Sequence, residues 1–244
     1  GRHASGSRFI FSNKEFRCDD AQWVLLRGPP AVSERITELT FSFGPGVFRQ
    51  PNLDMFETLV QQAKTMFKSC VLEHRLRRRA QLRILELYSG AGVLGLSLVS
   101  VAGAGATLLS TDSSPHCAVP FTRNAAAVLG SKSRASFRTM DASEAIALAE
   151  TEHFSVVVVD PPRRGLGHTV TACISATASI EAVVYVSCNP ATFCSDANNL
   201  LTSGFSVRAI SIYDSFPGTK HAEVLGVFSR ATATGHWHRR LKSH

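Results

Sequence analysis

The feature that most constrains the fold of this chain is a regular alternation of short β-rich runs and helix-length segments from residue 83 onward. The β-rich runs are Arg83–Leu87, Ala106–Thr111, Ser136–Met140, Phe154–Val159 and Ala182–Val186. The segments of helical length that follow them are Val93–Val101, Pro115–Leu129, Ser143–Thr151, Thr169–Ala178 and Ala191–Thr202. Strands that alternate with helices predict a parallel sheet covered on both faces, so the expected fold class is α/β, doubly wound.

Two more β-rich runs, Ser206–Tyr213 and Glu223–Ser229, close the pattern without a clear helix between them. We therefore expect a mostly parallel sheet of seven strands that ends in a β-hairpin.

The segment before residue 50 holds further runs of β-forming residues separated by turn residues, which predict a small N-terminal β-rich extension. These runs are Arg8–Phe11, Trp23–Arg27 and Glu38–Phe43.

A helix is predicted over Pro51–Cys70, because apolar residues recur there at spacings of three and four. Asn52 or Asp54 is the expected cap at its N-terminus. The chain then divides into a β-rich segment at 1–50, a linking helix within 51–82, a main domain at 83–230 and a basic tail at 231–244.

The charge of the chain is positive, with 26 Lys and Arg against 19 Asp and Glu and a formal net charge of +7. This excess favours an anionic partner such as nucleic acid, phosphate or a membrane surface. The basic run His74–Arg79 has two interpretations, a solvated helix end or a contact with an RNA backbone. No apolar run reaches the roughly 18 residues of a transmembrane helix, so we expect no membrane span.

Six cysteines are present, and none of them forms a Cys-x-x-Cys pair. We therefore expect no zinc or other metal site, no iron–sulfur cluster and no disulfide scaffold. Reduced thiols fit an intracellular, reducing compartment. That compartment is the cytoplasm, or an organelle or the nucleus if a targeting segment has been removed.

Ligands of doubly wound sheets bind beyond the carboxyl ends of the strands. Here the first strand runs into Glu86–Gly92, where Gly90 and Gly92 allow the backbone to approach a ligand. The second strand is followed by Asp112, which could bind ribose hydroxyls. This region fits a nicotinamide cofactor as well as an adenosine cofactor, since Gly95 completes a Gly-x-Gly-x-x-Gly pattern.

The next two strand ends also carry acidic residues. Asp141 follows the third strand, where it could bind an adenine amine, cap the next helix, or do both. The fourth strand ends in Asp160-Pro161-Pro162-Arg163, in which the two prolines stiffen the turn and force Asp160 out of helical geometry. An acid on a rigid loop at the mouth of a strand indicates a catalytic or substrate-binding residue.

The fifth strand ends in Ser187-Cys188-Asn189-Pro190, just before the next predicted helix. A thiol at a helix N-terminus has its thiolate favoured by the helix dipole, so Cys188 is a candidate nucleophile. The alternative for a lone cysteine after a strand is a small core residue. The neighbouring Asn-Pro and Asp160 favour the nucleophile.

Over residues 36–230 the chain resembles the catalytic part of the RNA uracil-carbon-5 methyltransferases, which form 5-methyluridine in transfer and ribosomal RNA. Five blocks are similar to family motifs and occur in the same order. These blocks are Gly46–Asn52, Glu86–Gly92, Asp160–Arg163, Val186–Pro190 and Phe216–Glu223. The resemblance implies a Rossmann-like class I methyltransferase fold, S-adenosylmethionine as cofactor, and tRNA or rRNA as partner of a monomer.

The resemblance also implies a role for each matched residue. Cys188 is the nucleophile that attacks carbon 6 of uracil, and Glu223 is the proton acceptor that removes the proton from carbon 5. The residues implied to contact the cofactor are Gln50, Tyr88, Gly90, Asp112, Asp141 and Asp160, and those implied to contact the substrate are Arg163, Asn189 and Asn52. Glu86 is expected to be a structural acid, whereas His221 could act near the base or be structural.

This chain departs from the family pattern at several positions, among them Ser89 in place of a common Cys, and Gly218 and Lys220 in place of bulkier or His residues. Val93 stands where many relatives have an Asn that contacts the methionine moiety of the cofactor. Relatives also carry an N-terminal RNA-binding barrel, in some cases with a four-cysteine iron–sulfur cluster, and neither is evident here. We therefore expect residues 1–50 to be the remnant of a central or RNA-binding region, with the module that selects the RNA missing.

Three alternatives remain. A catalytically inactive RNA-binding or chaperone module of the same fold would not need both Cys188 and Glu223. An RNA cytosine-carbon-5 methyltransferase also uses a cysteine, but that class has Pro-Cys after its fourth-strand Asp, where Pro161-Pro162 stands here. A nicotinamide oxidoreductase fits the first loop but not Ser-Cys-Asn-Pro.

Overall fold

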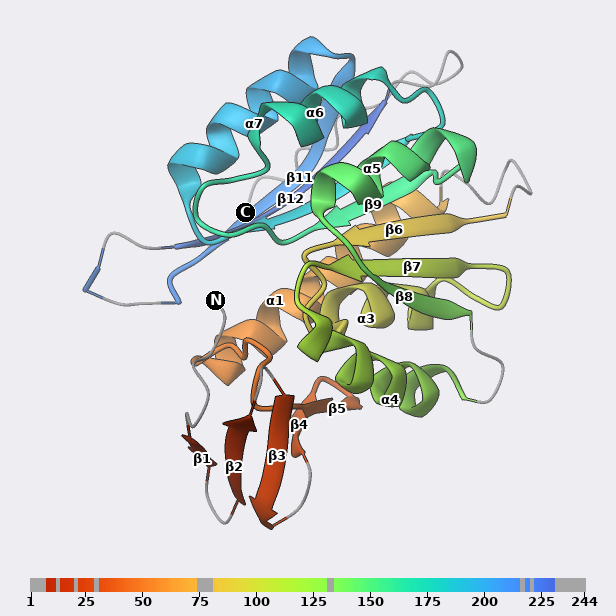
Figure 1. The fold of residues 1–244 in the computed structure, drawn as a ribbon. Coiled ribbons are helices and arrows are strands. Elements are labelled where there is room, and N and C mark those ends of the chain that lie inside the picture. The colour runs from red at the N-terminus through yellow and green to blue at the C-terminus, as the bar shows by residue number, and fades with distance from the viewer. Residues whose placement is uncertain are drawn as a thin grey trace.

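The computed structural model describes residues 8–11, 14–19, 22–28, 31–73, 81–130, 134–215, 218–219 and 222–230. Within this part of the chain, the main sheet has seven strands in the order β11-β12-β10-β9-β6-β7-β8 (Figure 1). The strands are β6 (Arg83–Leu87), β7 (Thr107–Asp112), β8 (Ala135–Thr139), β9 (Val156–Val159), β10 (Ala182–Ser187), β11 (Phe205–Tyr213) and β12 (Glu223–Arg230). The predicted doubly wound, mostly parallel sheet is confirmed.

Strands β6 to β10 are parallel, and β12 runs antiparallel to both β10 and β11. The predicted closing hairpin is therefore present, but its second strand lies inside the sheet, between β10 and β11. Burial explains this order. The first six residues of β12 are all buried, whereas β11 leaves Val207, Ile210 and Ile212 exposed at the edge. A strand that is apolar on both faces gains most from an interior position.

Helices cover both faces of the sheet (Figure 1). The helical elements are α1 (Leu53–Phe67) with a π-helical continuation (Lys68–Leu72), α3 (Val93–Val101), a 3-10 turn (Pro115–Cys117), α4 (Ala118–Leu129), α5 (Ala142–Thr151), α6 (Gly167–Ala176) and α7 (Pro190–Thr202). One core joins α1, α3 and α4 to Ile84 and its neighbours, and the other joins α5, α6 and α7 to Leu85. Consecutive strand residues point to opposite faces, which produces two separate cores.

The N-terminal part consists of two small antiparallel sheets, as the β-rich composition predicted. Three strands form the first, namely β1 (Arg8–Phe11), β2 (Lys14–Asp19) and β3 (Gln22–Arg27), and two form the second, namely β4 (Val32–Ile36) and β5 (Leu39–Phe43). The second sheet, which we call the β4–β5 ribbon, packs against α4.

Several features singled out in the sequence lie outside the described residues, namely the basic run 74–79, the tail 231–244 and His221. Among the helices that the structure does describe, none combines the length and apolar character needed to cross a membrane.

Candidate active site

The carboxyl ends of the central parallel strands lie level with one another. Leu87 at the end of β6 pairs with both Thr111 of β7 and Val159 of β9, and Val159 pairs with Tyr185 of β10. The loops that follow these strands therefore meet at one edge of the sheet. The sequence placed its candidate residues in these loops, and the structure brings the loops together.

Glu86, the first acid of the first loop, is buried within the fold. Its Oε1 accepts the Gly95 N–H at 2.6 Å, and its Oε2 accepts the Ser110 hydroxyl at 2.6 Å. A Cβ atom at Gly95 would collide with this carboxylate. Burial raises the pKa of Glu86 to about 7, although both hydrogen bonds oppose the shift. Glu86 is thus a structural acid as predicted, and Gly95 has a packing role.

The backbone after Glu86 forms an open turn at the edge of the sheet. Gly90 has φ +53°, and a Cβ placed on it would meet no atom within 4 Å, so space lies open above it. Tyr88 adopts φ +59°, a conformation that is uncommon for a residue with a side chain. Asp112 braces the turn, since its Oδ2 accepts the Gly90 N–H and its Oδ1 accepts the Ser114 N–H, both at 2.9 Å. The turn therefore offers exposed backbone to a ligand.

Asp141 occupies the N-cap position of α5, in an extended conformation, and its backbone N–H donates to Glu144 Oε2 at 3.3 Å. The capping interpretation is therefore correct, and the residue is exposed, so its carboxylate is still accessible to a ligand. Val93, where relatives have an Asn, is the first residue of α3 and is buried. Its side chain offers no polar contact to a ligand.

The candidate nucleophile and base belong to neighbouring strands. Ser187 at the end of β10 pairs with Val224 of β12 in the antiparallel ladder. Cys188 is the residue after Ser187 and Glu223 is the residue before Val224, so both lie at the same end of the β10–β12 ladder. Asp160 follows β9 on the other side of β10. Burial, followed by the charges of Glu223 and Asp160, raises the pKa of the Cys188 thiol.

Burial dominates the electrostatics of this cluster. It raises the pKa of Asp160 to about 8, with further contributions from the charges of Glu223 and Glu86. It also raises the pKa of Glu223, against the opposing effect of the Arg163 guanidinium. These carboxyl groups therefore hold their protons more tightly than they would in water.

The favourable effect of the helix dipole on the Cys188 thiolate stays a prediction, whereas the net pKa of this thiol is raised. Burial, followed by the Glu223 and Asp160 charges, raises the pKa of this thiol, and Arg163 opposes the shift only in part. Both effects disfavour the thiolate, because burial removes it from water and the carboxylates carry the same charge.

Glu223 itself is only 5% exposed, and its Oε2 finds no hydrogen-bond partner among the described residues. A buried carboxylate oxygen without a partner is uncommon in folded proteins. This oxygen is therefore free to accept a proton or a hydrogen bond from a ligand beside Cys188.

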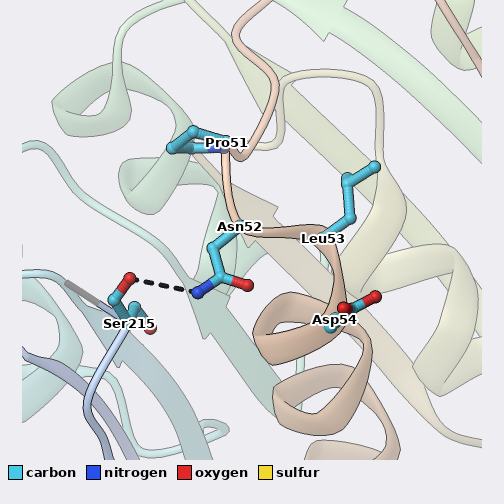
Figure 2. A pocket seen from close by; sticks show the side chains of 5 residues that line it. All are labelled: Pro51, Asn52, Leu53, Asp54 and Ser215. Carbon is cyan, nitrogen blue, oxygen red and sulfur yellow. Dashed lines mark hydrogen bonds between the residues drawn. The ribbon is translucent and has the colours of Figure 1, made fainter. Parts of the chain in front are cut away.

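Asn52 connects the start of α1 to the segment that precedes Glu223. Its Oδ1 accepts the Met55 N–H at 3.2 Å, which caps the helix, and its Nδ2 donates to the Ser215 carbonyl at 3.1 Å (Figure 2). Of the two predicted caps, Asn52 is the correct one. A hollow of about 410 Å³ opens beside this contact, lined by Pro51, Asn52, Leu53, Asp54 and Ser215. Gln50 is half-buried and lies just before α1.

Asn189 has both ends of its side chain engaged in local contacts. Its Oδ1 accepts the Ala191 N–H at 3.1 Å and caps α7, and its Nδ2 donates to the Arg163 carbonyl at 3.0 Å. Arg163 itself is exposed. Sequence reasoning missed Thr192 and Asp196, which also hold this loop. Their spacing from Asn189, three and seven residues, is the helical signal that could have identified them.

Comparison with known proteins identifies the family. A family model described as tRNA (uracil-5-)-methyltransferase matches residues 32–231. The 23S rRNA (uracil(1939)-C(5))-methyltransferase RlmD of Pseudomonas aeruginosa is 32% identical over 193 residues, which is 78% of this chain and 39% of that protein. An uncharacterized RNA methyltransferase of Protochlamydia amoebophila is 28% identical over 212 residues, or 86% and 50% of the two chains.

Solved structures agree with this match. The Pyrococcus abyssi tRNA (uracil-54, C5)-methyltransferase, in complex with S-adenosyl-L-homocysteine, superposes with a TM-score of 0.65 at 26% identity, covering 86% of this chain and 47% of that one. An S-adenosylmethionine-dependent methyltransferase of Agrobacterium tumefaciens shares the fold, with a TM-score of 0.57 at 14% identity, covering 86% and 74% of the two chains. This chain spans half or less of the length of the curated relatives cited above. Because the family match covers both the β4–β5 ribbon and the whole main sheet, the chain belongs to the tRNA (uracil-5-)-methyltransferase family.

Proposed function

We propose that this chain transfers a methyl group from S-adenosylmethionine to carbon 5 of a uridine in tRNA or rRNA, through a covalent Cys188–uracil intermediate. The observation that carries the proposal is that Cys188 directly follows, and Glu223 directly precedes, the last residue pair of the β10–β12 ladder, while Asp160 follows the neighbouring strand β9. A thiol and a buried carboxylate, one oxygen of which has no hydrogen-bond partner among the described residues, fit a reaction that needs a nucleophile and a proton acceptor at adjacent ring atoms.

The turn after β6 fits the proposed cofactor. The open space above Gly90 would admit the methionine end of S-adenosylmethionine, because no side chain blocks the backbone there. Each carboxylate oxygen of Asp112 accepts one backbone N–H and keeps a lone pair for a ribose hydroxyl. In this proposal Gln50, Tyr88, Asp141 and Asp160 supply the remaining contacts to the cofactor.

The proposed mechanism uses the residues of this chain in sequence. The Cys188 thiolate adds to carbon 6 of uracil, and the ring becomes an enolate with a nucleophilic carbon 5. S-adenosylmethionine, when bound, supplies an electrophilic methyl group for that carbon. Glu223 then removes the proton from carbon 5, the carbon 5–carbon 6 double bond re-forms, and the Cys188 thiolate leaves. Asp160 and Arg163 orient the ring and stabilise charge on its oxygens.

The proposed substrate is a uridine flipped out of its stack, since a stacked base cannot reach a thiol at the end of a sheet strand. Arg163 and Arg164 are exposed beside the cluster and would contact the flanking phosphates. Asn52 and Asn189 would contact the nucleotide, and the β-rich segment before residue 50 would belong to an RNA-contacting part. We propose a monomer that acts in an intracellular, reducing compartment, where Cys188 stays a thiol.

The decisive experiment uses RNA that contains 5-fluorouridine. Fluorine cannot leave as a proton, so the chain should form a protein–RNA adduct that survives denaturation and depends on S-adenosylmethionine. An adduct that persists in Cys188→Ala, or no adduct in the wild type, contradicts the mechanism. RNA with 5-fluorocytidine is the matched control, and trapping on that RNA alone would favour the cytosine-specific alternative.

A further inference from the structure

Helix α7 presents a row of polar side chains to the loop between β9 and α6, which we call the 160–166 loop. Asn189, Thr192 and Asp196 are spaced three and four residues apart, so they share one face of the helix. Asn189 Nδ2 donates to the Arg163 carbonyl at 3.0 Å, and the Thr192 hydroxyl shares its hydrogen between that carbonyl, at 3.3 Å, and the Asn189 carbonyl, at 3.1 Å. One backbone oxygen of the loop is thus held by two side chains of α7.

Asp196 lies deeper in the same row and is only 6% exposed. Its Oδ2 accepts the Leu166 N–H at 2.8 Å and the Tyr185 hydroxyl at 2.6 Å. A Cβ atom at Gly165 would lie 2.6 Å from Asp196 Oδ2, and Gly165 has φ +77°. The loop backbone is therefore packed against the Asp196 carboxylate. Only glycine combines that conformation with so close an approach.

The partner of Asp196 in the sheet is Tyr185, which is fully buried in β10. Burial, together with the hydrogen bond and the charge of Asp196, raises the pKa of Tyr185, so its hydroxyl remains a donor. Tyr185 lies in the strand that ends at Ser187, immediately before Cys188. Asp196 therefore contacts the strand that carries the nucleophile and the loop that carries Asp160 and Arg163.

We propose that Asp196, assisted by Thr192, is a positioning residue that fixes the 160–166 loop relative to Cys188. The two loops then approach the uracil ring as one rigid unit, although Asp196 itself does not touch the ring. This inference rests on the proposed function, and it adds a role that the mechanism above does not include. A displacement of about 1 Å in such a unit can slow a reaction by about 100-fold.

The test compares Asp196→Ala and Thr192→Val with Thr202→Val, a matched control at the far end of α7. The readout is the single-turnover rate of adduct formation on 5-fluorouridine RNA at saturating cofactor. We expect Asp196→Ala to slow the reaction about 10- to 100-fold, and Thr192→Val to slow it about fivefold through the removal of one hydrogen bond. Thr202→Val should react at the wild-type rate.

Two additional measurements distinguish the positioning of the 160–166 loop by Asp196 from a contribution of Asp196 to the stability of the whole fold. Asp196→Asn keeps an oxygen that can accept both hydrogen bonds, so it should recover most of the rate. Affinity for S-adenosylhomocysteine, measured by calorimetry, should change by less than about twofold in each variant, since α7 does not line the turn at Gly90. Wild-type rates in both Asp196→Ala and Thr192→Val would overturn the inference. If Asp196→Ala does not fold, the rate of Thr192→Val alone decides.

Hydrogen exchange tests the inference independently of the chemistry. The Leu166 amide donates to Asp196, so it should be protected in the wild type and should exchange at least about tenfold faster in Asp196→Ala, whereas Thr192→Val, which leaves that hydrogen bond in place, should keep the wild-type protection. Unchanged exchange at Leu166 in Asp196→Ala would overturn the positioning role. A wild-type protein that forms no adduct would instead contradict the proposed function, and the exchange measurement would still report whether Asp196 holds the loop.

Discussion

At the scale of single residues, the environment of Cys188, Glu223 and Asp160 favours the protonated form of each side chain. The thiol and its two neighbouring carboxyl groups all have raised pKa values, and Arg163 is the cation that opposes this for both Cys188 and Glu223. Before substrate and cofactor bind, the thiol and the two carboxyl groups would therefore tend to stay protonated. A nearby cation would lower their pKa values by stabilising the negative charge of the ionised forms. The S-adenosylmethionine sulfonium and Arg163 are the cations available for that purpose.

Arg163→Ala should shift the ionisation of Cys188 to higher pH. The guanidinium favours the thiolate, so its removal raises the thiol pKa further, and alkylation by iodoacetamide should then require more alkaline conditions. Mass spectrometry of the peptide that contains Cys188, followed from pH 6 to about 10, measures the shift. Arg138→Ala is a control at a distant ion pair with Glu152. An alkylation profile identical to the wild type would contradict the proposed contact.

Glu223→Gln should trap the covalent intermediate on ordinary uridine RNA. The amide cannot accept the proton from carbon 5, so the methylated adduct accumulates instead of releasing product. Denaturing gel electrophoresis would detect the trapped complex. The double variant Cys188→Ala/Glu223→Gln should show none, and normal turnover by Glu223→Gln would mean that another group is the base.

Glu86 should make the stability of the fold depend on pH. Its pKa rises from 4.5 to about 7 on burial, so the folded state binds its proton more tightly than the unfolded state does. The stabilisation is complete below pH 4.5 and is lost as the pH rises to 7 and above, by an amount on the order of 3 kcal/mol. Urea unfolding should show a smaller loss between pH 5 and 8 in Glu86→Gln than in the wild type. Equal losses would contradict a buried, protonated Glu86.

At the scale of elements, Asn124 of α4 joins the β4–β5 ribbon to the turn after β6. Its Oδ1 accepts the Ser42 N–H at 2.7 Å, and its Nδ2 donates to the carbonyls of Ser42 at 3.1 Å and Ala91 at 2.9 Å. The residue is 1% exposed. The ribbon is thus connected to the backbone of the proposed cofactor turn by a single side chain.

Asn124→Ala should weaken both the fold and the binding of S-adenosylhomocysteine. Three backbone groups lose their partner, two on half-buried Ser42 and one on buried Ala91, which costs on the order of 1–3 kcal/mol each where water cannot replace the side chain. Urea unfolding measures the first effect and calorimetry the second. Arg123→Ala, an exposed neighbour on the same helix, should change neither. Wild-type affinity for the ligand in Asn124→Ala would show that the turn holds its shape without the ribbon.

The alternation of strands and helices was predictable because period and length are local properties of the chain. The insertion of β12 between β10 and β11 was not, since it depends on how two strands compete for one position. The strands β2 and β4 were missed because their charged residues obscure the alternation. The raised pKa of Cys188 was also missed, because burial, its main cause, and the charge of Glu223 both depend on how distant parts of the chain pack together.

At the scale of the whole molecule, the net charge of +7 should appear as salt-dependent RNA binding. Arg163→Ala/Arg164→Ala should reduce the slope of log affinity against log salt by roughly 0.7 for each single-strand phosphate that the variant no longer neutralises. Filter binding between 50 and about 300 mM salt measures the slope. Arg134→Ala, before β8 at the opposite edge of the sheet, should leave it unchanged. Equal slopes for the wild type and the Arg163→Ala/Arg164→Ala variant would mean that residues other than Arg163 and Arg164 contact the phosphates.

The interior position of β12 also bears on how the protein is made. Strands β6 to β10 leave the ribosome first, and β10 then presents a fully buried, apolar strand with one unpaired edge until residues 223–230 emerge. The nascent chain is therefore exposed to misassembly during that interval. Because the proposed base is the first residue of β12, the proposed nucleophile is made before its proton acceptor, and the proposed active site is complete only once β12 has joined the sheet.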